Sequence, residues 1–402
     1  MSSIFRTTAT ADFFSHSLVS LKILHTFKPE YKNIVKQMIP ILETAHTARI
    51  QIEKDPQSVQ RLIVALRGVD PRIMLPRVPK ELGGLGLSFQ EAHLFKVLLS
   101  RASGALNFTL TQSLTAAAQI ADSKTSAKVS WLNQIREGNL FAMAQSPHLT
   151  RFENPTVIGR LLPDGSYILS TKDFRWVTGW GHATSFIAGF FDLQTKQEIT
   201  AVLPFTTCTQ EHGGRIICSQ PLETKAAYSA NTVSMNIENW HIAFTDILAK
   251  NPIGTFSETI KHSTNLDSYQ VGVIAEIIAL IHNNIKHPLT REIVEHFTAQ
   301  LAELETMIIE REKDTDIQSI RAFAITLFNE VINITRQLFM GRALLVNDPL
   351  IQYYDLLCKE GYLYAAAVPS EKLLEFVYKR TVLKQNNTTI NSPKDLSSYS
   401  VM

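Results

Sequence analysis

Hydrophobic residues recur every three or four positions through the first third of the chain, the spacing that gathers them on one face of an α-helix. This pattern runs through residues 18–24, 34–50 and 59–66, and again through 89–101, 106–121 and 124–137. The segment between the two groups, residues 71–86, is rich in proline and glycine, which interrupt regular structure. Gly138 stands where the last of these helices can end. We therefore predict an N-terminal helical domain over residues 1–139.

From about residue 140 the period changes to two, which is typical of β-strands. Alternating runs flank Asp164 and Gly165, a dipeptide that favours a tight hairpin turn. Val, Ile, Phe and Thr dominate the runs that follow, as expected on a pleated surface. The pattern predicts a β-domain over residues 140–245.

The helical period returns near residue 257 and predicts helices over residues 266–283, 290–313, 316–345 and 371–383. Together they form a C-terminal bundle over residues 246–385. The polar tail 386–402 is expected to be disordered, since it has little apolar surface to bury. Because the strands cluster in one block instead of alternating with helices, the predicted class is α+β, with a central β-sheet or barrel domain between helical parts.

Composition places the chain among ordinary globular proteins, with 402 residues of which 45% are hydrophobic and 19% charged. The net charge of +2 gives no strong field for nucleic acid. No apolar run approaches the roughly 20 residues that a membrane crossing needs. The cysteines, Cys208, Cys218 and Cys358, show no metal-ligand spacing, so we expect no metal site. Reduced thiols suit a cytoplasmic location, which is our expectation.

Several short segments carry a resemblance to a known family. They include the turn Gly83-Gly84-Leu85-Gly86 and residues 131–144, 164–172, 175–179, 199–204 and 231–240. Their order and spacing resemble those of the acyl-CoA dehydrogenases. The segments cover roughly residues 75–245, and the helical pattern extends the likeness to about residue 385. The resemblance implies the same succession of helical, β and helical domains.

The resemblance also implies a cofactor and a substrate. FAD would lie between the β-domain and the C-terminal bundle of a homodimer or homotetramer. The substrate would be an acyl-CoA or another acyl thioester. An electron-transfer protein would be a further partner. Trp176 would pack against the isoalloxazine, and Thr178 would hydrogen-bond near its N5 or O4. Phe141 and Met143 would lie along the flavin. Ordinary β-domain packing is the alternative, because alternating apolar residues need no cofactor.

After the first strand the chain departs from the family pattern. Ala144 stands where the family has a flavin-facing threonine, and no Gly-x-Gly follows it. Gln145 could reach a flavin carbonyl and Ser146 could donate a hydrogen bond, while a plain loop is the alternative. The family's dimer-crossing arginine is missing. Lys286 or Arg291 could supply a positive charge for the diphosphate of FAD, although lysine lacks the planar fork of arginine. For Arg291 the alternative is a surface position at the start of a helix.

The residue that would remove a proton from the substrate is not evident. The family uses a glutamate, whose pKa rises toward the operating range in an apolar cleft. Counting from Pro349 puts Tyr364 near the expected position, and Glu360 is the nearest glutamate. Glu276 lies inside an apolar helix near the family's alternative position. These three residues are the candidates, and for Glu276 the alternative is a buried carboxylate paired with a neighbour.

Three functions follow from these patterns. The first is α,β-dehydrogenation of an acyl thioester with hydride transfer to flavin N5. The second is a flavin-dependent monooxygenase on the same fold, which needs no α-proton base. The third is a non-catalytic scaffold that has lost the base, which the missing glycines and arginine favour. Trp176 and Thr178 favour a flavin, so a flavin-dependent oxidoreductase is our leading hypothesis.

Overall fold

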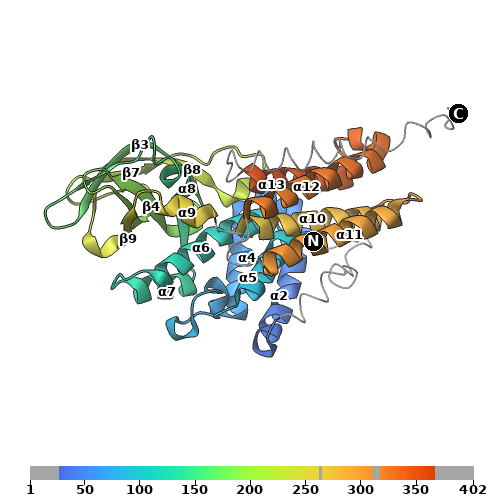
Figure 1. The fold of residues 1–402 in the computed structure, drawn as a ribbon, viewed down its shortest axis with the longest axis horizontal. Coiled ribbons are helices and arrows are strands. Elements are labelled where there is room, and N and C mark those ends of the chain that lie inside the picture. The colour runs from blue at the N-terminus through green and yellow to red at the C-terminus, as the bar shows by residue number, and fades with distance from the viewer. Residues whose placement is uncertain (1–26, 262–264, 311–316, 367–402) are drawn as a thin grey trace.

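The computed structural model describes residues 27–261, 265–310 and 317–366. Within these ranges, helices precede a strand-rich middle part and a helical bundle follows it (Figure 1). The predicted α+β order is thereby confirmed. The predicted helices at 18–24 and 371–383 and the tail 386–402 lie outside the described residues.

Local signals explain where the N-terminal helices begin and end. The elements of this part are α2 (Pro29–Thr47), α3 (Arg49–Lys54), α4 (Pro56–Val69), η1 (Pro71–Met74), η2 (Lys80–Leu82), α5 (Phe89–Ala102), α6 (Gly104–Asp122) and α7 (Lys128–Glu137). Helix α5 begins with a capping box in which Ser88 and Glu91 satisfy each other's backbone N–H groups. Helix α7 ends at Gly138, whose φ of 102° suits a residue without a Cβ. The predicted helix stop at Gly138 is confirmed.

The strands of the middle part form two sheets. One has the order β1 (Leu140–Ala144), β4 (Ala183–Asp192), β5 (Gln197–Pro204), β9 (Ile247–Pro252). The other has the order β2 (Gly159–Leu161), β3 (Tyr167–Thr178), β8 (Thr232–Ile242), β7 (Arg215–Cys218), β6 (Cys208–Thr209). Strand β1 pairs with β4 in parallel, and the remaining pairs of named strands are antiparallel. Strand β9 lies beyond the boundary expected at residue 245.

Aromatic side chains fill the space between the two sheets. The ring of Phe174 on β3 lies 5.8 Å from that of Phe186 on β4, and Tyr167 meets Phe190 at 5.4 Å. These inward residues alternate with more exposed ones along β3, which is the pattern that predicted strands here. The predicted turn is also found, since Gly165 has φ 84° between the antiparallel strands β2 and β3.

Helix α10 (Asn265–Asn284) is the central member of the C-terminal bundle and contacts α5, α11 (Thr290–Ile309), α12 (Ile317–Phe339) and α13 (Pro349–Ala366). Its described side chains are mostly buried, which accounts for its apolar sequence. Gly272 allows α10 to approach α5 closely, because a Cβ there would lie 2.6 Å from the Cβ of Ser100. The shorter helices α8 (Ser146–Leu149) and α9 (Thr255–Lys261) connect strands to their neighbours.

One predicted helix is shorter than its pattern suggested. The apolar spacing predicted a helix to residue 345, but α12 ends at Phe339 and the 3₁₀ turn η5 (Met340–Leu344) follows. Met340 has φ 50°, a left-handed conformation that stops an α-helix. Its neighbour Gly341 lowers the cost of leaving the helix at this point.

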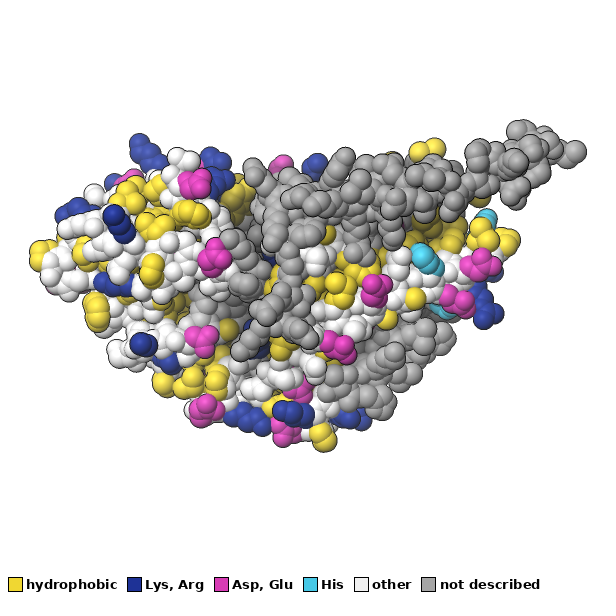
Figure 2. All heavy atoms as spheres, viewed as in Figure 1, with side chains coloured by type: hydrophobic (Ala, Val, Ile, Leu, Met, Phe, Trp, Pro, Cys, Tyr) yellow, Lys and Arg dark blue, Asp and Glu magenta, His cyan; other side chains and the backbone are white. Residues whose placement is uncertain are grey.

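On the face shown in Figure 2, the described Lys and Arg side chains are interspersed with Asp and Glu side chains. Among the described helices, none has the length and apolar character that a membrane span requires. Within the described residues, no three His, Cys, Asp or Glu side chains gather as a metal site would require.

Candidate functional site

Trp176 lies at an irregularity in strand β3. Between Phe174, which pairs with Met235, and Val177, which pairs with Val233, β3 contains one residue more than β8. The extra residue bulges out of the ladder, and Trp176 has φ 64° there. Its side chain is 54% exposed, although most large aromatic residues of the β-domain are buried. The bulge therefore turns the indole away from the core.

This conformation is costly for a bulky residue. A left-handed backbone away from glycine costs on the order of 1–3 kcal/mol, and exposing an indole forgoes its burial. Such strain is concentrated at sites that bind ligands or act chemically. The exposed indole at a strained bulge is therefore a candidate ligand platform.

Thr178 lies two residues further along β3, beyond the bulge. It is buried, and its Oγ1 lies 2.9 Å from Oγ1 of Thr232 on β8. Each hydroxyl has one proton, and their shared hydrogen bond uses one of the two. The second proton is available to an acceptor placed beside the pair.

The four candidates on and after β1 differ in their surroundings. Phe141 is fully buried and packs in the core, whereas Met143 is partly buried. Gln145 is buried, and its Oε1 accepts a hydrogen bond of 2.8 Å from Gln119. Its Nε2 has no hydrogen-bond partner among the residues that the structure describes. Ser146 begins the short helix α8 in place of a plain loop. Gln145 is therefore the candidate with an unused buried donor.

Strand β1 and helix α8 lie close to the end of β3. A Cβ on Gly179, which follows Thr178, would lie 3.9 Å from the Cβ of Ala142 on β1. His148 on α8 stacks on Phe174 with a centroid distance of 4.0 Å. Burial lowers the pKa of His148 to about 4, so the imidazole is neutral at pH 7. No sequence signal pointed to His148, because its contact depends on how α8 folds back on β3.

The two basic residues considered for a phosphate group lie on the surface of the bundle. Lys286 is exposed, and Arg291 donates a 2.8 Å hydrogen bond to Glu295 one turn further along α11. Both of these arginine and glutamate side chains are mostly exposed. Their contacts match those of an ordinary helix surface.

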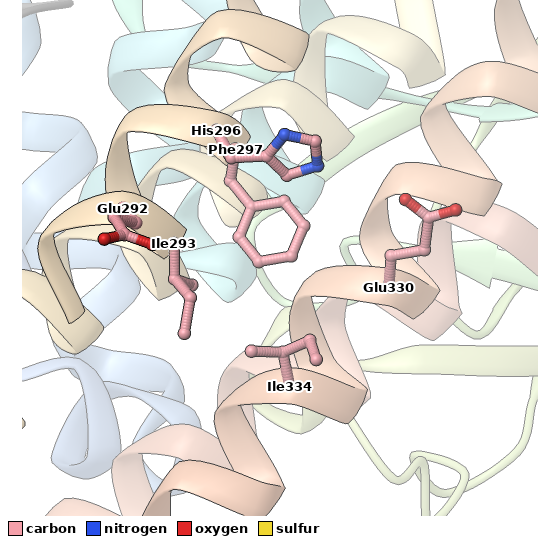
Figure 3. Close-up of a pocket in the computed structure, with 6 residues that line it drawn as sticks. All are labelled: Glu292, Ile293, His296, Phe297, Glu330 and Ile334. Carbon is pink, nitrogen blue, oxygen red and sulfur yellow. The ribbon is translucent and has the colours of Figure 1, made fainter. Parts of the chain in front are cut away.

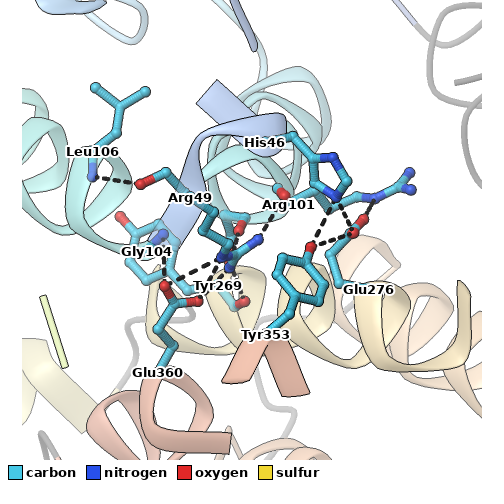
Figure 4. A network of polar contacts seen from close by, with 11 residues as sticks. His46, Arg49, Arg101, Gly104, Leu106, Tyr269, Glu276, Tyr353 and Glu360 are labelled. Carbon is cyan, nitrogen blue, oxygen red and sulfur yellow. Dashed lines mark hydrogen bonds and ion pairs between the residues drawn. The ribbon is translucent and has the colours of Figure 1, made fainter. Parts of the chain in front are cut away.

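Glu276, a candidate base, is buried in an ionic network (Figure 4). Arg101 Nε donates to its Oε1 at 2.7 Å, while Nε2 of His46 and the hydroxyl of Tyr353 lie 2.8 and 3.3 Å from its Oε2. Burial alone raises the pKa of Glu276, but the charges of Arg101 and His46 outweigh it and lower the pKa to about 2. A carboxylate held this strongly in its charged form is a poor proton acceptor.

Glu360 is paired in a similar way. The guanidinium of Arg49 binds its carboxylate through Nε and Nη2, and the backbone N–H of Gly104 adds a bond of 3.2 Å (Figure 4). A Cβ on Gly104 would collide with the glutamate side chain, which explains glycine at this position. These contacts favour a structural role for Glu360. Tyr364 belongs to helix α13, but its side chain lies outside the described residues.

A separate hollow opens between α11 and α12 of the bundle (Figure 3). It has a volume of about 420 Å³, and its lining consists of Glu292, Ile293, His296, Phe297, Glu330 and Ile334. Apolar atoms make up nearly all of its surface. It shares no residue with the site around Trp176.

Comparison with known proteins shows the fold. No protein-family model matches the chain, and no curated protein sequence does. Among solved structures, butyryl-CoA dehydrogenase from Megasphaera elsdenii is similar with a TM-score of 0.66 and 14% identity, covering 88% of this chain and 98% of that chain. Dibenzothiophene monooxygenase (TdsC) from Paenibacillus sp. A11-2 is similar with a TM-score of 0.68 and 13% identity, covering 87% and 97%.

The prolyl acyl carrier protein oxidase AnaB is similar as well, with a TM-score of 0.64 and 12% identity over 88% of this chain and 99% of that chain. These chains are matched along almost their entire length. The protein therefore has the acyl-CoA dehydrogenase fold, as the sequence motifs predicted.

Proposed function

We propose that the protein is a flavin-dependent oxidoreductase. The observation that carries this proposal is the exposed indole of Trp176, which a strained bulge presents at the end of β3. Proteins with this fold include a dehydrogenase, an oxidase and a monooxygenase that has been studied with FMN. Because the indole is mostly exposed, packing among the described residues of this part does not explain a tryptophan at the bulge.

The described residues offer the groups that an isoalloxazine needs, an aromatic face and hydrogen-bond donors. Trp176 would cover the ring face, since an indole offers a large rigid apolar surface. The Thr178–Thr232 pair has a hydroxyl proton to donate, and Gln145 has an unused N–H. Carbonyl and ring-nitrogen acceptors along the flavin edge match such donors. When bound, the flavin would supply two-electron chemistry.

The resemblance implies FAD, and the proposed contacts concern only the ring that FAD and FMN share. The missing Gly-x-Gly and the surface placement of Arg291 give the diphosphate of FAD little support from the described residues. Mass spectrometry of the released cofactor distinguishes the two flavins. FAD remains our expectation, and a partner subunit would then contribute to its diphosphate site.

The reaction that we propose is the α,β-dehydrogenation of an acyl thioester. It requires a proton acceptor, and the pairing of Glu276 with Arg101 and of Glu360 with Arg49 makes both glutamates unsuitable. The same pairing favours the second candidate, a monooxygenase that needs no such acceptor. The two reactions differ in what reduces the flavin: an acyl-CoA in the first case, and NAD(P)H or a reductase in the second.

The absorption spectrum of the purified full-length protein tests the flavin. We expect the bands of a bound flavin, and a marked loss of flavin in Trp176→Ala. Phe244→Ala is the matched control, because Phe244 is also an exposed aromatic residue of this part of the chain. A wild-type protein that takes up no flavin on reconstitution would support the scaffold hypothesis. Anaerobic addition of acyl-CoAs then separates dehydrogenation, which bleaches the flavin, from monooxygenation.

We also propose that the protein self-associates through a bundle-end patch, defined as Met340, Leu344, Leu345 and Val346. These side chains are exposed, with Leu344 at 82% and Val346 at 81%. Monomeric proteins rarely expose such a cluster. The apolar hollow of Figure 3 lies on the same bundle, so a two-fold dimer would let the patch of each copy fill the hollow of the other. With a net charge of only +2, two copies of the chain repel each other weakly, so charge does not prevent the dimer.

A further inference from the structure

Glu53 is a carboxylate at the meeting point of the three parts of the chain. It lies near the end of α3, a helix that contacts both η3 (Tyr228–Ala230) and α13. Its Oε1 accepts a 2.9 Å hydrogen bond from the backbone N–H of Tyr228, 175 residues away in sequence. Within the described part of the chain, this is the carboxylate's one hydrogen bond, and no arginine or lysine forms an ion pair with it. Glu53 thus differs from Glu276 and Glu360.

The segment that Glu53 binds is joined to the candidate flavin site. Asn231, directly after η3, accepts hydrogen bonds at its carbonyl from the N–H groups of Gly179 and Trp180, at 3.2 and 3.1 Å. Gly179 directly follows Thr178. The left-handed conformations of Ala227 and Asn231, with φ 53° and 52°, fix the turn between these contacts. Glu53 is therefore tied to the end of β3 that carries the proposed flavin ligands.

Helix α13 brings a second element to the same place. Helices α2 and α3 both contact α13: His46 of α2 lies beside Tyr353, and Arg49 of α3 binds Glu360, which is two turns further along α13. Glu53 lies one turn beyond Arg49 on α3, near the turn of α13 that carries Lys359 and Glu360. Position 364, where the sequence led us to expect a base, is one turn beyond Glu360. A carboxylate supplied by α3 thus approaches the region where a base was expected from α13.

Among the described residues, the groups that face Glu53 leave its carboxyl without a dedicated counter-ion. From α3 comes Arg49, which is already bound to Glu360, and from α13 come Glu360 itself and Lys359. Burial raises the pKa of Glu53 to about 7, against the lowering effect of the Tyr228 N–H. Glu360 raises this pKa further, whereas Arg49 and Lys359 lower it. A carboxyl with a pKa near the operating pH both accepts and releases a proton readily.

We propose that Glu53 is the proton acceptor of the site, and that it takes the α-proton of an acyl thioester bound between η3 and the end of α13. The inference rests on the proposed dehydrogenation. The α C–H bond breaks and its proton moves to a Glu53 oxygen, while its electron pair forms the new Cα=Cβ bond. The β C–H bond would break with its electron pair, and a bound flavin would serve as the two-electron oxidant that accepts this hydride. Glu53 is partly exposed and returns its proton to water.

The direct test is the titration of the Glu53 carboxyl in the full-length protein, by infrared difference spectroscopy between wild type and Glu53→Gln. We expect one carboxyl band that titrates near pH 7 in wild type and is missing from Glu53→Gln. Glu153→Gln, which changes an exposed glutamate, is the matched control and should keep the band. Glutamine keeps the oxygen that accepts from Tyr228, so the variant is expected to fold. A Glu53 carboxyl that is fully ionised at pH 5 would overturn the proposal.

The rate of anaerobic flavin reduction by a series of acyl-CoAs, from butyryl-CoA to palmitoyl-CoA, tests the role. We expect Glu53→Gln to slow reduction about 10²–10⁴-fold with unchanged flavin content, and Glu53→Asp to recover part of the rate. Equal rates in wild type and Glu53→Gln would overturn the proposal while leaving the proposed function intact. Wild-type flavin that no acyl-CoA reduces would overturn both the dehydrogenation and the role of Glu53. A wild-type protein without flavin would overturn the proposed function at an earlier step.

Discussion

Arg101 and Glu276 form an ion pair of 2.7 Å in the interior, and the pair joins α5 of the N-terminal part to the central helix α10 of the bundle. Both side chains are almost completely shielded from water. Separating two such charges from water is expensive, and only close pairing compensates for it. The geometry therefore assigns Glu276 to joining the N-terminal helices to the C-terminal bundle.

This role predicts the effect of Glu276→Gln. The substitution removes the carboxylate that pairs with the buried Arg101 guanidinium, so we expect the free energy of unfolding to fall by about 3–5 kcal/mol in urea denaturation. Glu295→Gln, which removes the exposed partner of Arg291, should change it by less than about 1 kcal/mol. A stable Glu276→Gln protein that binds flavin normally but is not reduced by acyl-CoA would show instead that Glu276 is the base.

The low pKa of Glu276 also predicts acid sensitivity. The folded protein keeps this carboxylate charged down to about pH 2, whereas the ordinary value is 4.5. The stability that the pair contributes is therefore present above about pH 4.5 and is lost as the pH falls toward 2. In urea denaturation, the difference in free energy of unfolding between wild type and Glu276→Gln should shrink as the pH falls from 5 to 2. A difference that stays constant with pH would contradict this assignment.

Glu53 predicts the opposite pH dependence. Its pKa is raised from 4.5 to about 7 in the folded protein, so the folded state holds a proton that the unfolded chain has released. Wild-type stability should therefore fall as the pH rises from about 4.5 to 7. Over this range, the free energy of unfolding of Glu53→Gln should rise relative to that of wild type by roughly 1–3 kcal/mol. The partial exposure of the Glu53 side chain favours the lower values. Parallel stability profiles for the two proteins would show that the Glu53 pKa is ordinary.

The hydroxyl pair predicts a modest change in flavin affinity. Thr178→Val keeps the shape of the side chain and removes one hydroxyl, leaving Thr232 without its 2.9 Å partner. We expect flavin binding to weaken by about 1 kcal/mol, or roughly fivefold in Kd, as measured by calorimetry with deflavinated protein. Thr178→Ser keeps the hydroxyl and should bind nearly as wild type does. Equal affinities for all three proteins would exclude Thr178 as a flavin ligand.

The bundle-end patch predicts an effect on self-association. The double substitution Leu344→Asp and Val346→Asp places two charges on the patch, so sedimentation should show a shift from oligomer toward monomer. Leu193→Asp is the control, because Leu193 is an exposed apolar residue in the turn between β4 and β5. Dissociation by the control as well, or an unchanged oligomer in the double variant, would place the interface elsewhere.

Features with local causes were predictable from the sequence. The hairpin at Gly165 and the helix stop at Gly138 depend on a residue's own conformational freedom, and both are found as expected. The order of the three parts follows from hydrophobic period alone. The end of α12 at Phe339 was not predicted, because the apolar spacing continues into η5 and does not reveal the left-handed Met340.

The chemistry of the candidate site depends on long-range pairing that the sequence does not display. The bulge at Trp176 exists only because β3 pairs with β8, about sixty residues further along the chain. Glu276 stays ionised because it pairs with Arg101, which is 175 residues away in sequence. Glu53 accepts its hydrogen bond from Tyr228, which is also 175 residues away. The family resemblance predicted Trp176 and Thr178 as site residues. Glu53 could not be predicted, because its contacts form only when the N-terminal helices pack against the rest of the chain.

The most direct test of the flavin site is a fluorescence titration of the deflavinated full-length protein with FAD and with FMN, in wild type and in Trp176→Phe. Phenylalanine keeps an aromatic face, so binding should persist while the reporting indole is removed. We predict saturable quenching of tryptophan emission in wild type and a much smaller saturable quench in Trp176→Phe. Equal quenching in the two proteins, or no saturable quenching in wild type with either flavin, would contradict the placement of the flavin on Trp176.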